Sequence, residues 1–274
     1  MHRRDCLDRT ILDDDATCGM GELHITHPTG TFAITPASRV AIRAIGANRQ
    51  LLSGTGIDWG SGTGCMAIAA ARLSSVERII GLELSPADVE IARRNAAQNG
   101  VGDKLQFIHA DSYTPFAASD RENLHSLRGR IDFVLANPPA SDDDDGFGFR
   151  RVILRGAGEY LLPGGRIFLN ISYQYGEQRT RQLCRDAPGF SYLEPIASTD
   201  WVPFDLRCRD LLDCLELYAR EEERGGLPYA FAHPEDPDGD SINAGAALQY
   251  FHQTGRSPLS KWQTHLFEWR GLQP

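Results

Sequence analysis

Long apolar runs are what this sequence most clearly lacks. Nowhere in its 274 residues is there an apolar stretch long enough to span a bilayer as a helix. The N-terminal segment MHRRDCLDRTILDDD is charged and contains no apolar core of the kind that a signal peptide needs. We therefore expect a cytoplasmic protein with no membrane partner.

Positive charge is also scarce. Lysine and arginine number 28 against 37 aspartates and glutamates, so the formal net charge is -9 and the sequence pI is near 5.4. Tight binding to a nucleic-acid backbone depends on cationic side chains that displace counterions from the phosphates. The charge balance therefore disfavours a nucleic-acid partner without excluding one.

Paired cysteines are absent as well. The six cysteines are scattered, and no two of them form a CxxC pair. In a chain of this length the pattern is typical of reduced thiols, and it indicates neither a disulfide framework nor zinc ligation. We predict no bound metal.

What the sequence does contain is an alternation of short apolar strands and longer helical patterns. One helix is clearly bounded, because Ser85 is suited to be its N-cap, Pro86 occupies the first position and Gly100 follows the end. The alternation favours an α/β fold with a doubly wound, mostly parallel sheet, whose functional groups gather at the carboxyl ends of the strands. The expected strands span residues 54–59, 78–83, 105–109, 131–136, 166–171, 190–196 and 264–270, and the expected helices span 63–73, 86–99, 150–162, 210–224 and 243–252, with a turn at 163–165.

Four segments are expected along the chain. Residues 1–20 are predicted to be poorly ordered, 21–200 to form the core domain, 201–261 an inserted subdomain, and 262–274 the last strand of the core sheet and a tail. The insertion is inferred because the strands on either side of it would ordinarily pair, yet about sixty residues separate them. Long insertions in this architecture tend to carry specificity, so it either covers the substrate or mediates oligomerisation.

The stretch GIDWGSGTG, residues 56–64, places glycines directly between an expected strand and an expected helix. Gly60, Gly62 and Gly64 let the backbone turn tightly and approach a flat or anionic ligand without an intervening Cβ. A dinucleotide site would have its third glycine where this chain has Cys65, so the motif fits that class imperfectly. A purely structural turn is the alternative.

Two acidic residues end the next strands at the same edge of the predicted sheet. Glu83 ends the second strand, where its carboxylate can accept hydrogen bonds from both hydroxyls of a ribose. Asp111 follows the third strand in HADSY, where it can accept one from an exocyclic adenine amine. Each can also be a solvated acid at a strand end, but their joint placement favours a nucleoside site.

The stretch LANPPA, residues 135–140, puts Asn137, Pro138 and Pro139 directly after an apolar strand. Two prolines stop the strand and remove two backbone donors, so carbonyl oxygens there are free to face something else. The alternative is a motif that only terminates the strand.

In the stretches DWGSGTG, GLELSPADVEIARRNAAQNG, HADSY and ANPPA the sequence resembles the class I S-adenosylmethionine-dependent methyltransferases, over roughly residues 22–200. The resemblance implies a Rossmann-like sheet of seven strands and S-adenosylmethionine as the cofactor. It also implies that the residues that bind the cofactor are Asp58, Gly60, Ser61, Gly62, Gly64, Glu83, Leu84, Asp111, Ser112 and Asn137.

Asn-Pro-Pro at this place is similar to the amino-methylating branch of that family, which includes protein-glutamine methyltransferases and methyltransferases of exocyclic adenine or guanine amines. The segment GELHITHPTGTFAITP, residues 21–36, resembles the element before the glycine motif in that branch, and it predicts a hairpin that leads into a helix at 37–45. The resemblance makes Asn137, Pro138 and Pro139 the residues that orient the methyl acceptor. A substrate nitrogen over this strand end can donate to the side-chain oxygen of Asn137 and to the carbonyl of Pro138, while Pro139 keeps the loop rigid.

Ala140 departs from that branch, in which this position is commonly an aromatic residue that stacks on a flat amine or amide. Its small side chain puts a planar nucleobase substrate in doubt. Phe147 or Phe149, in the loop that follows, can supply a ring from elsewhere or pack in the core, and Tyr173 is a further candidate for substrate contact. The aspartates at 142–145 either attract a cationic amine or form a hydrated loop.

The sequence thus predicts an S-adenosylmethionine-dependent N-methyltransferase that acts on an amine or amide nitrogen of a small molecule or a protein side chain. A nucleic-acid exocyclic-amine methyltransferase is the first alternative. A nicotinamide-dependent oxidoreductase and a cofactor-binding protein without turnover are the others, and the oligomeric state is not predicted.

Overall fold

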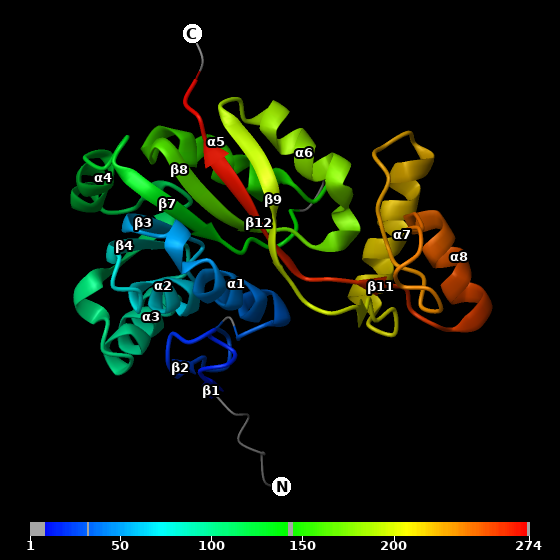
Figure 1. Ribbon diagram of the computed structural model, residues 1–274, viewed down its shortest axis with the longest axis horizontal. Coiled ribbons are helices and arrows are strands. Elements are labelled where there is room, and N and C mark those ends of the chain that lie inside the picture. The colour runs from blue at the N-terminus through cyan, green and yellow to red at the C-terminus, as the bar shows by residue number, and fades with distance from the viewer. Residues whose placement is uncertain (1–8, 32, 142–144, 273–274) are drawn as a thin grey trace, which may run out of the picture.

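The computed structural model describes residues 9–31, 33–141 and 145–272, and its centre is a single mixed sheet (Figure 1). The strand order is β6-β5-β4-β3-β7-β8-β12-β9. Strands β3, β4, β5, β7 and β8 are parallel, whereas β12 runs antiparallel between β8 and β9. The strands of this sheet are β3 (Gly54–Trp59), β4 (Val76–Glu83), β5 (Leu105–Asp111), β6 (Thr114–Pro115), β7 (Ile131–Ala136), β8 (Leu161–Asn170), β9 (Phe190–Ser198) and β12 (Gln263–Trp269).

The predicted doubly wound α/β fold is confirmed, but the sheet has eight strands where seven were predicted. The eighth strand is β6, which comprises only Thr114 and Pro115 and pairs antiparallel with the end of β5. The turn expected at 163–165 lies inside β8, where the pairing with β7 shifts register between Ile131 and Phe133 and Gly164 has a positive φ of 84°. A glycine that tolerates this backbone lets the strand bulge instead of ending.

Helices cover both faces of the sheet, and alternate side chains of each strand serve the two layers. In β7, Phe133 and Leu135 pack with α1, α2 and α3, whereas Val134 and Ala136 pack with α5 on the opposite face. Burial on both faces explains why the strand is a continuous apolar run. The helices of the core are α1 (Pro36–Ala47), α2 (Cys65–Ala71), α3 (Pro86–Gln98), α4 (Ala118–His125), α5 (Gly148–Tyr160) and α6 (Gly176–Asp186), with short 3-10 turns η1 (Arg49–Leu51), η2 (Gly102–Lys104) and η3 (Tyr173–Tyr175).

Local signals fix the ends of two of these helices. The Ser85 side chain accepts a hydrogen bond from the backbone N–H of Asp88, and Pro86 opens α3, so the predicted cap is confirmed. At α1, Thr35 and Ser38 form a reciprocal capping box. This box matters for the site, because it places Ser38 beside the Asn-Pro-Pro loop.

The N-terminal hairpin lies earlier in the chain than the sequence predicted. Its strands are β1 (Arg9–Leu12) and β2 (Leu23–Thr26), so residues 9–20 are folded where poor order was expected, and residues 1–8 lie outside the described residues. The free edge of β2 is satisfied by side chains of α3, because Asn99 and Asn95 bond the backbone of His24 and Thr26. These bonds protect an edge strand and tie the hairpin to the core.

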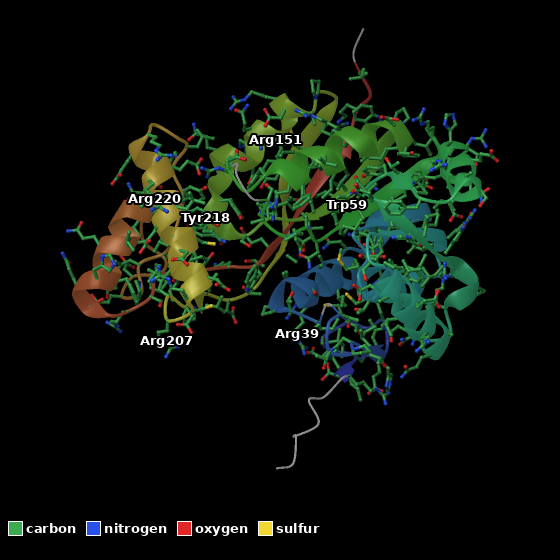
Figure 2. All side chains as sticks on the ribbon, turned by 180° about the vertical axis from the view of Figure 1, so that it is seen from behind. Arg39, Trp59, Arg151, Arg207, Tyr218 and Arg220 are labelled. Atoms are coloured by element: carbon green, nitrogen blue, oxygen red, sulfur yellow. The ribbon has the colours of Figure 1, made fainter. Side chains whose placement is uncertain are left out.

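The inserted segment, residues 201–261, forms a separate body at one end of the sheet (Figure 1). Its elements are β10 (Val202–Pro203), α7 (Arg209–Glu223), α8 (Ala244–Thr254) and β11 (Leu259–Ser260), and β10 pairs antiparallel with β11. Helix α7 lies between α8 and the core, as Figures 1 and 2 show from opposite sides. Within the described ranges, no helix is both long and apolar enough to cross a membrane.

Candidate functional site

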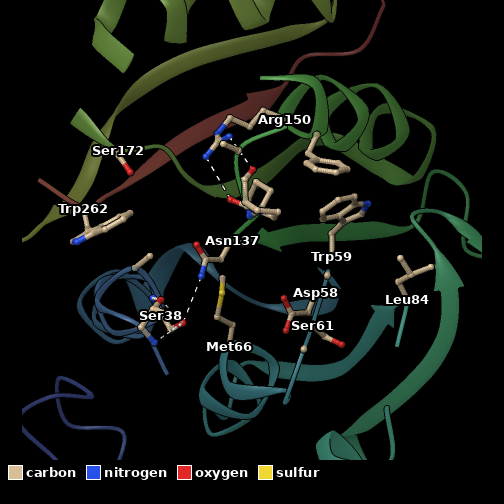
Figure 3. Close-up of a pocket in the computed structure, with 18 of the residues that line it drawn as sticks. Ser38, Asp58, Trp59, Ser61, Met66, Leu84, Asn137, Arg150, Ser172 and Trp262 are labelled. Atoms are coloured by element: carbon tan, nitrogen blue, oxygen red, sulfur yellow. Dashed lines mark hydrogen bonds between the residues drawn. The ribbon is translucent and has the colours of Figure 1, made fainter. Parts of the chain in front are cut away.

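A cavity of about 740 Å³ opens where the carboxyl ends of β3, β4, β5 and β7 meet (Figure 3). This is the edge at which parallel α/β sheets bind ligands. Thirteen of the predicted site residues line it: Asp58, Gly60, Ser61, Gly62, Glu83, Leu84, Asp111, Ser112, Asn137, Pro138, Pro139, Ala140 and Phe149.

The glycine loop forms the floor of the cavity. Gly60 has a positive φ of 65°, and a Cβ added there would meet no atom within 4 Å, so its backbone faces open space. The backbone N–H of Ser61 bonds to the carbonyl of Leu82, 3.0 Å away, which holds the loop against β4. The Ser61 hydroxyl is buried, lies toward Gly81 of β4 and finds no hydrogen-bond partner among the described residues.

Glu83 connects the end of β4 to this loop. One carboxylate oxygen accepts from the Gly62 N–H at 2.7 Å, and the other accepts from the Ser85 N–H at 2.8 Å. Each oxygen has a second lone pair, so the carboxylate can still accept from a diol in the cavity. The sequence predicted only the ligand contact, whereas the structure shows that Glu83 also shapes the glycine loop.

Asp58 lies under the loop and is only 1 % exposed. Its carboxylate accepts from the backbone N–H of Ala67 at 3.0 Å, in the first turn of α2. Burial, and secondarily the nearby charge of Glu83, raises the pKa of Asp58 to about 7. Asp58 is therefore a carboxyl group that changes its charge near neutral pH at the wall of the cavity.

The end of β5 is fixed by a contact that the sequence did not reveal. Trp59 donates its indole N–H to the hydroxyl of Ser112 at 2.9 Å, and Ser112 adopts a positive φ of 54°. The Phe149 ring lies 6.1 Å from the Trp59 ring, centroid to centroid. Asp111, predicted to accept from an adenine amine, and Phe149, predicted as a candidate ring for the substrate, both line the cavity.

Asn137 is held by a chain of hydrogen bonds that begins on the last strand of the sheet. Thr264 donates to the side-chain oxygen of Asn170 at 2.7 Å, and the amide nitrogen of Asn170 donates to the side-chain oxygen of Asn137 at 2.9 Å. The Asn137 amide nitrogen lies 3.5 Å from the Ser38 hydroxyl (Figure 3). The amide of Asn137 therefore has one defined orientation, and its oxygen keeps one lone pair.

Arg150 lies behind the two prolines. Its guanidinium is 3.2 Å from the carbonyl oxygen of Pro139, 3.5 Å from that of Pro138 and 2.9 Å from that of Gly146, and the side chain is buried. A planar group with several donors can hold several carbonyls at once. The rigidity that the sequence assigned to Pro139 is therefore shared with a buried arginine, which no sequence pattern marked.

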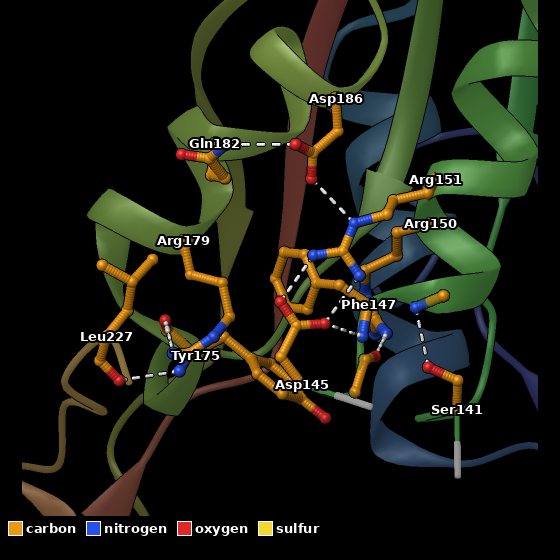
Figure 4. A network of polar contacts seen from close by, with 12 residues as sticks. Ser141, Asp145, Phe147, Arg150, Arg151, Tyr175, Arg179, Gln182, Asp186 and Leu227 are labelled. Atoms are coloured by element: carbon orange, nitrogen blue, oxygen red, sulfur yellow. Dashed lines mark hydrogen bonds and ion pairs between the residues drawn. The ribbon is translucent and has the colours of Figure 1, made fainter. Parts of the chain in front are cut away.

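Three predicted site residues do not line the cavity. Gly64 is the N-cap of α2, and a Cβ there would meet Phe107 at 2.9 Å, so it serves packing. Phe147 is fully buried and packs edge-on against Tyr175, which confirms the core alternative for this ring (Figure 4). Tyr173 instead packs edge-on against Trp201, with centroids 4.9 Å apart.

Asp145 is the described member of the aspartate run, and it is bound elsewhere. Its two oxygens accept from Arg151 at 2.7 and 2.5 Å, and Arg151 also bonds Asp186 at 2.7 Å (Figure 4). Although burial acts to raise it, these bonds leave the pKa of Asp145 below its usual value. Asp145 therefore does not attract a cationic substrate, and residues 142–144 lie outside the described residues.

The wall opposite the strand ends comes from the insertion, and sequence reasoning did not assign its residues. Leu211, Cys214 and Tyr218 are spaced as i, i+3 and i+7 on α7 and face the cavity together with Phe204 and Trp262. That spacing is visible in the sequence as one apolar stripe. The stripe alone does not tell a cavity wall from a core contact, which is why it carried no assignment.

Together these residues fit a nucleoside-containing cofactor at the strand ends and an acceptor beyond them. The open face of Gly60 and the spare lone pairs of Glu83 lie on one side of the cavity. Asn137 lies between Asp58 and Ser61 on one side and Trp262 on the other (Figure 3).

Known proteins with similar sequences support this assignment. The family model described as methyltransferase small domain matches residues 22–185, more than half of the chain. The release factor glutamine methyltransferase of Cereibacter sphaeroides is 31% identical over 144 residues, which cover 44% of this chain and 48% of that protein. The ribosomal protein L11 methyltransferase of Dechloromonas aromatica is 31% identical over 160 residues, covering 58% and 42%.

These matches do not extend over whole proteins. The chain spans about half the length of most of the curated relatives that it matches. Among solved structures, a methyltransferase from Pyrococcus furiosus superposes with a TM-score of 0.52 at 16% identity, covering 91% of this chain and 90% of that one. At this identity the superposition shows a shared fold.

Proposed function

The chain belongs to the methyltransferase small domain family, and we propose that it transfers the methyl group of S-adenosylmethionine to an amine or amide nitrogen. The observation that carries the proposal is the oriented Asn137 amide, which shares one cavity with the glycine loop and with Glu83. A cofactor cradle and an acceptor clamp side by side are what a direct transfer between two ligands requires.

The cofactor is proposed to lie against Gly60, Ser61, Glu83 and Asp111. When bound, S-adenosylmethionine supplies an electrophilic methyl group on a positively charged sulfur. The Glu83 carboxylate accepts from the ribose hydroxyls, and Asp111 accepts from the adenine amine. Gly60 brings backbone close to the ligand, because a Cβ there would meet no atom within 4 Å.

The acceptor is proposed to bind at Asn137 and Pro138. The side-chain oxygen of Asn137 and the carbonyl of Pro138 accept N–H bonds from the nitrogen, which turns its lone pair toward the cofactor. Positioning of this kind lowers a reaction barrier by roughly 7–11 kcal/mol. Asn170 fixes the Asn137 amide and Arg150 fixes the proline carbonyls, so both acceptor atoms are in place before the substrate arrives.

The acceptor is proposed to be a small molecule or a protein side chain, and not a nucleic acid. Two of the relatives have names that specify protein substrates, a release factor and ribosomal protein L11. The net charge of -9 opposes binding to a phosphate backbone. Phe149 is the observation that favours a nucleobase, because it brings an aromatic ring to the cavity that Ala140 does not provide.

Calorimetry with two cofactors tests the proposal. We expect the purified chain to bind S-adenosylmethionine and not NAD(H), and to transfer a labelled methyl group to one fraction when metabolites, RNA and proteins of a cell extract are offered separately. Binding of NAD(H) alone would support an oxidoreductase. Binding of S-adenosylmethionine with no transfer to any fraction would support a cofactor-binding protein without turnover.

A further inference from the structure

We infer that the acceptor is an uncharged small molecule with a sizeable apolar body, and that the insertion supplies the wall that selects it. The inference rests on the proposed function, because it concerns the part of the same cavity that lies beyond Asn137 and Pro138. We call this part the acceptor chamber and define it by Tyr175, Phe204, Leu211, Cys214, Tyr218 and Trp262.

The acceptor chamber is built from apolar and aromatic side chains. Three of its residues, Leu211, Cys214 and Tyr218, form one stripe of α7, and Phe204 precedes that helix. Trp262 enters from the segment between β11 and β12 and faces the Asn137 side of the cavity (Figure 3). Apolar surface that lines a cavity gains free energy when an apolar ligand displaces water from it.

The carboxylates of the cavity lie outside the acceptor chamber, and the guanidinium of Arg150 borders it, 5.2 Å from the centroid of the Tyr175 ring. Among the described lining residues, the carboxylates belong to Asp58, Glu83 and Asp111 at the ends of β3, β4 and β5. The guanidinium of Arg150 donates to backbone carbonyls of the Asn-Pro-Pro loop and its neighbourhood. An ammonium group in the chamber would therefore lose water without gaining a counter-charge, which costs several kcal/mol in an apolar setting. A phosphate would meet a guanidinium whose N–H groups already donate to the carbonyls of Pro139 and Gly146.

The wall is preformed because Tyr218 is locked into a buried cluster. Its ring stacks on Tyr229 with centroids 3.9 Å apart, and the Tyr229 hydroxyl donates to Glu221 at 2.5 Å. The guanidinium of Arg179, on α6, lies over the Tyr229 ring, 4.0 Å from its centroid. It also donates to the carbonyl of Leu227 at 2.7 Å (Figure 4). These contacts join the insertion to the core, so the chamber binds without first ordering its wall.

A polypeptide acceptor fits this chamber poorly. Each residue of a peptide brings a backbone donor and an acceptor, and burial without partners costs free energy. The Gln174 side-chain oxygen, a polar group nearby, already accepts from Ser260 at 2.6 Å, and its backbone carbonyl accepts from Ala230 at 2.9 Å. The cavity of about 740 Å³ also has to hold the cofactor, so only part of this volume is left for the acceptor.

The test is calorimetric binding of matched probes to the full chain with saturating S-adenosylhomocysteine. The probes are 3-phenylpropanamide, propanamide, 3-phenylpropylamine and a hydrophilic glutamine-containing pentapeptide. We expect 3-phenylpropanamide to bind at least tenfold more tightly than propanamide, which lacks the apolar body, and than 3-phenylpropylamine, which is cationic. Equal affinities, or tighter binding of the peptide or the cation, would overturn the inference.

A charge placed in the wall sharpens the test. Leu211→Glu is expected to weaken 3-phenylpropanamide binding at least tenfold and to improve binding of the cationic amine, with S-adenosylhomocysteine affinity within about twofold of the parent chain. Leu217→Glu, on the exposed side of α7, makes the same change outside the cavity and should alter none of these affinities. An unchanged probe affinity in Leu211→Glu would show that the probe binds elsewhere.

Failure of the inference and failure of the proposed function give different results. If S-adenosylhomocysteine binds and 3-phenylpropanamide shows no preference, the acceptor chamber is wrong and the methyltransferase proposal stands. If S-adenosylhomocysteine does not bind, both are overturned. If Leu211→Glu does not fold, the probe series on the parent chain decides alone.

Discussion

The two ends of the cavity are built in different ways. At the strand ends, backbone groups and buried carboxylates form the surface, and each is fixed by hydrogen bonds such as that from Gly62 to Glu83. At the other end, side chains of one inserted helix form an apolar wall. The first end follows from the sheet itself, because parallel strands bring their carboxyl ends together. The second is free to change without altering the fold, so we expect it to set the choice of acceptor.

Removing the Asn137 amide, which lies between the two ends of the cavity, should have the largest effect on turnover. Asn137→Ala is expected to lower turnover at least a hundredfold, because small misplacement of a reacting group costs about that much, while the dissociation constant of S-adenosylmethionine stays within about threefold. Steady-state kinetics with an active acceptor fraction and calorimetry with the cofactor measure the two quantities.

The control for this change is Asn123→Ala, which truncates an exposed asparagine of α4 away from the cavity. It should leave both quantities unchanged. Parent-like turnover in Asn137→Ala would remove Asn137 from the mechanism, and the oriented amide would then serve only to end the strand.

A change at the strand ends should separate cofactor binding from acceptor binding. Glu83→Ala removes the acceptor of the Gly62 and Ser85 N–H groups together with the proposed ribose contact. Hydrogen bonds to charged groups contribute roughly 1.5–3 kcal/mol, so we expect S-adenosylmethionine affinity to fall by about ten- to a hundredfold. Affinity for 3-phenylpropanamide, measured without cofactor, should change by less than about threefold.

Glu77→Ala is the matched control, since Glu77 is an exposed residue near the beginning of the same strand. Equal losses for cofactor and probe in Glu83→Ala would contradict the separation of the two ends. A loss confined to the probe would reverse their assignment.

The sequence signals for the strand-end half of the candidate site are local. A strand, a glycine turn and a helix that are adjacent in the chain must be adjacent in space, and Ser85 with Pro86 fixes the next helix by local bonding alone. Thirteen of the predicted residues accordingly meet at one cavity. Contacts between distant segments have no such signal, and the burial of Arg150 behind the proline loop is one of them.

Errors arose where tertiary packing outweighed local pattern. The Arg9–Leu12 strand lies in a charged segment that suggested poor order, but its partner β2 and the asparagines of α3 stabilise it. Tyr173 was a candidate for substrate contact but packs against the insertion, and Phe147, for which the sequence left a core role open, lies in the core. Chain proximity alone does not determine which way a side chain points.

Removing one bond from the hydrogen-bond chain that begins on the last strand should lower turnover moderately, because this chain holds the residue between the two ends of the cavity. Thr264→Val keeps the shape of a fully buried side chain but removes the donor to Asn170, which then holds the Asn137 amide less firmly. We expect kcat to fall about three- to tenfold with little change in cofactor affinity, since a lost hydrogen bond is worth about 1 kcal/mol. Thr264→Ser restores the donor and should restore kcat, whereas a variant that suffered only from poorer packing would not recover.

The smallest expected effect is a pH dependence that belongs to the strand-end half alone. Because the pKa of Asp58 is raised to about 7, the carboxyl gains its negative charge as pH rises from about 6 to 8. An added negative charge at the wall of the cavity favours a cationic sulfonium, so S-adenosylmethionine should bind about threefold more tightly at the higher pH, and uncharged S-adenosylhomocysteine should change less. Asp58→Asn keeps an oxygen for the Ala67 N–H but cannot ionise, so it should abolish the difference between the two ligands. Calorimetric titrations at three pH values measure the difference in affinity between the two ligands. If the affinity for both ligands rises equally with pH, the pH dependence comes from the ribose or adenine contacts and not from the charge on sulfur.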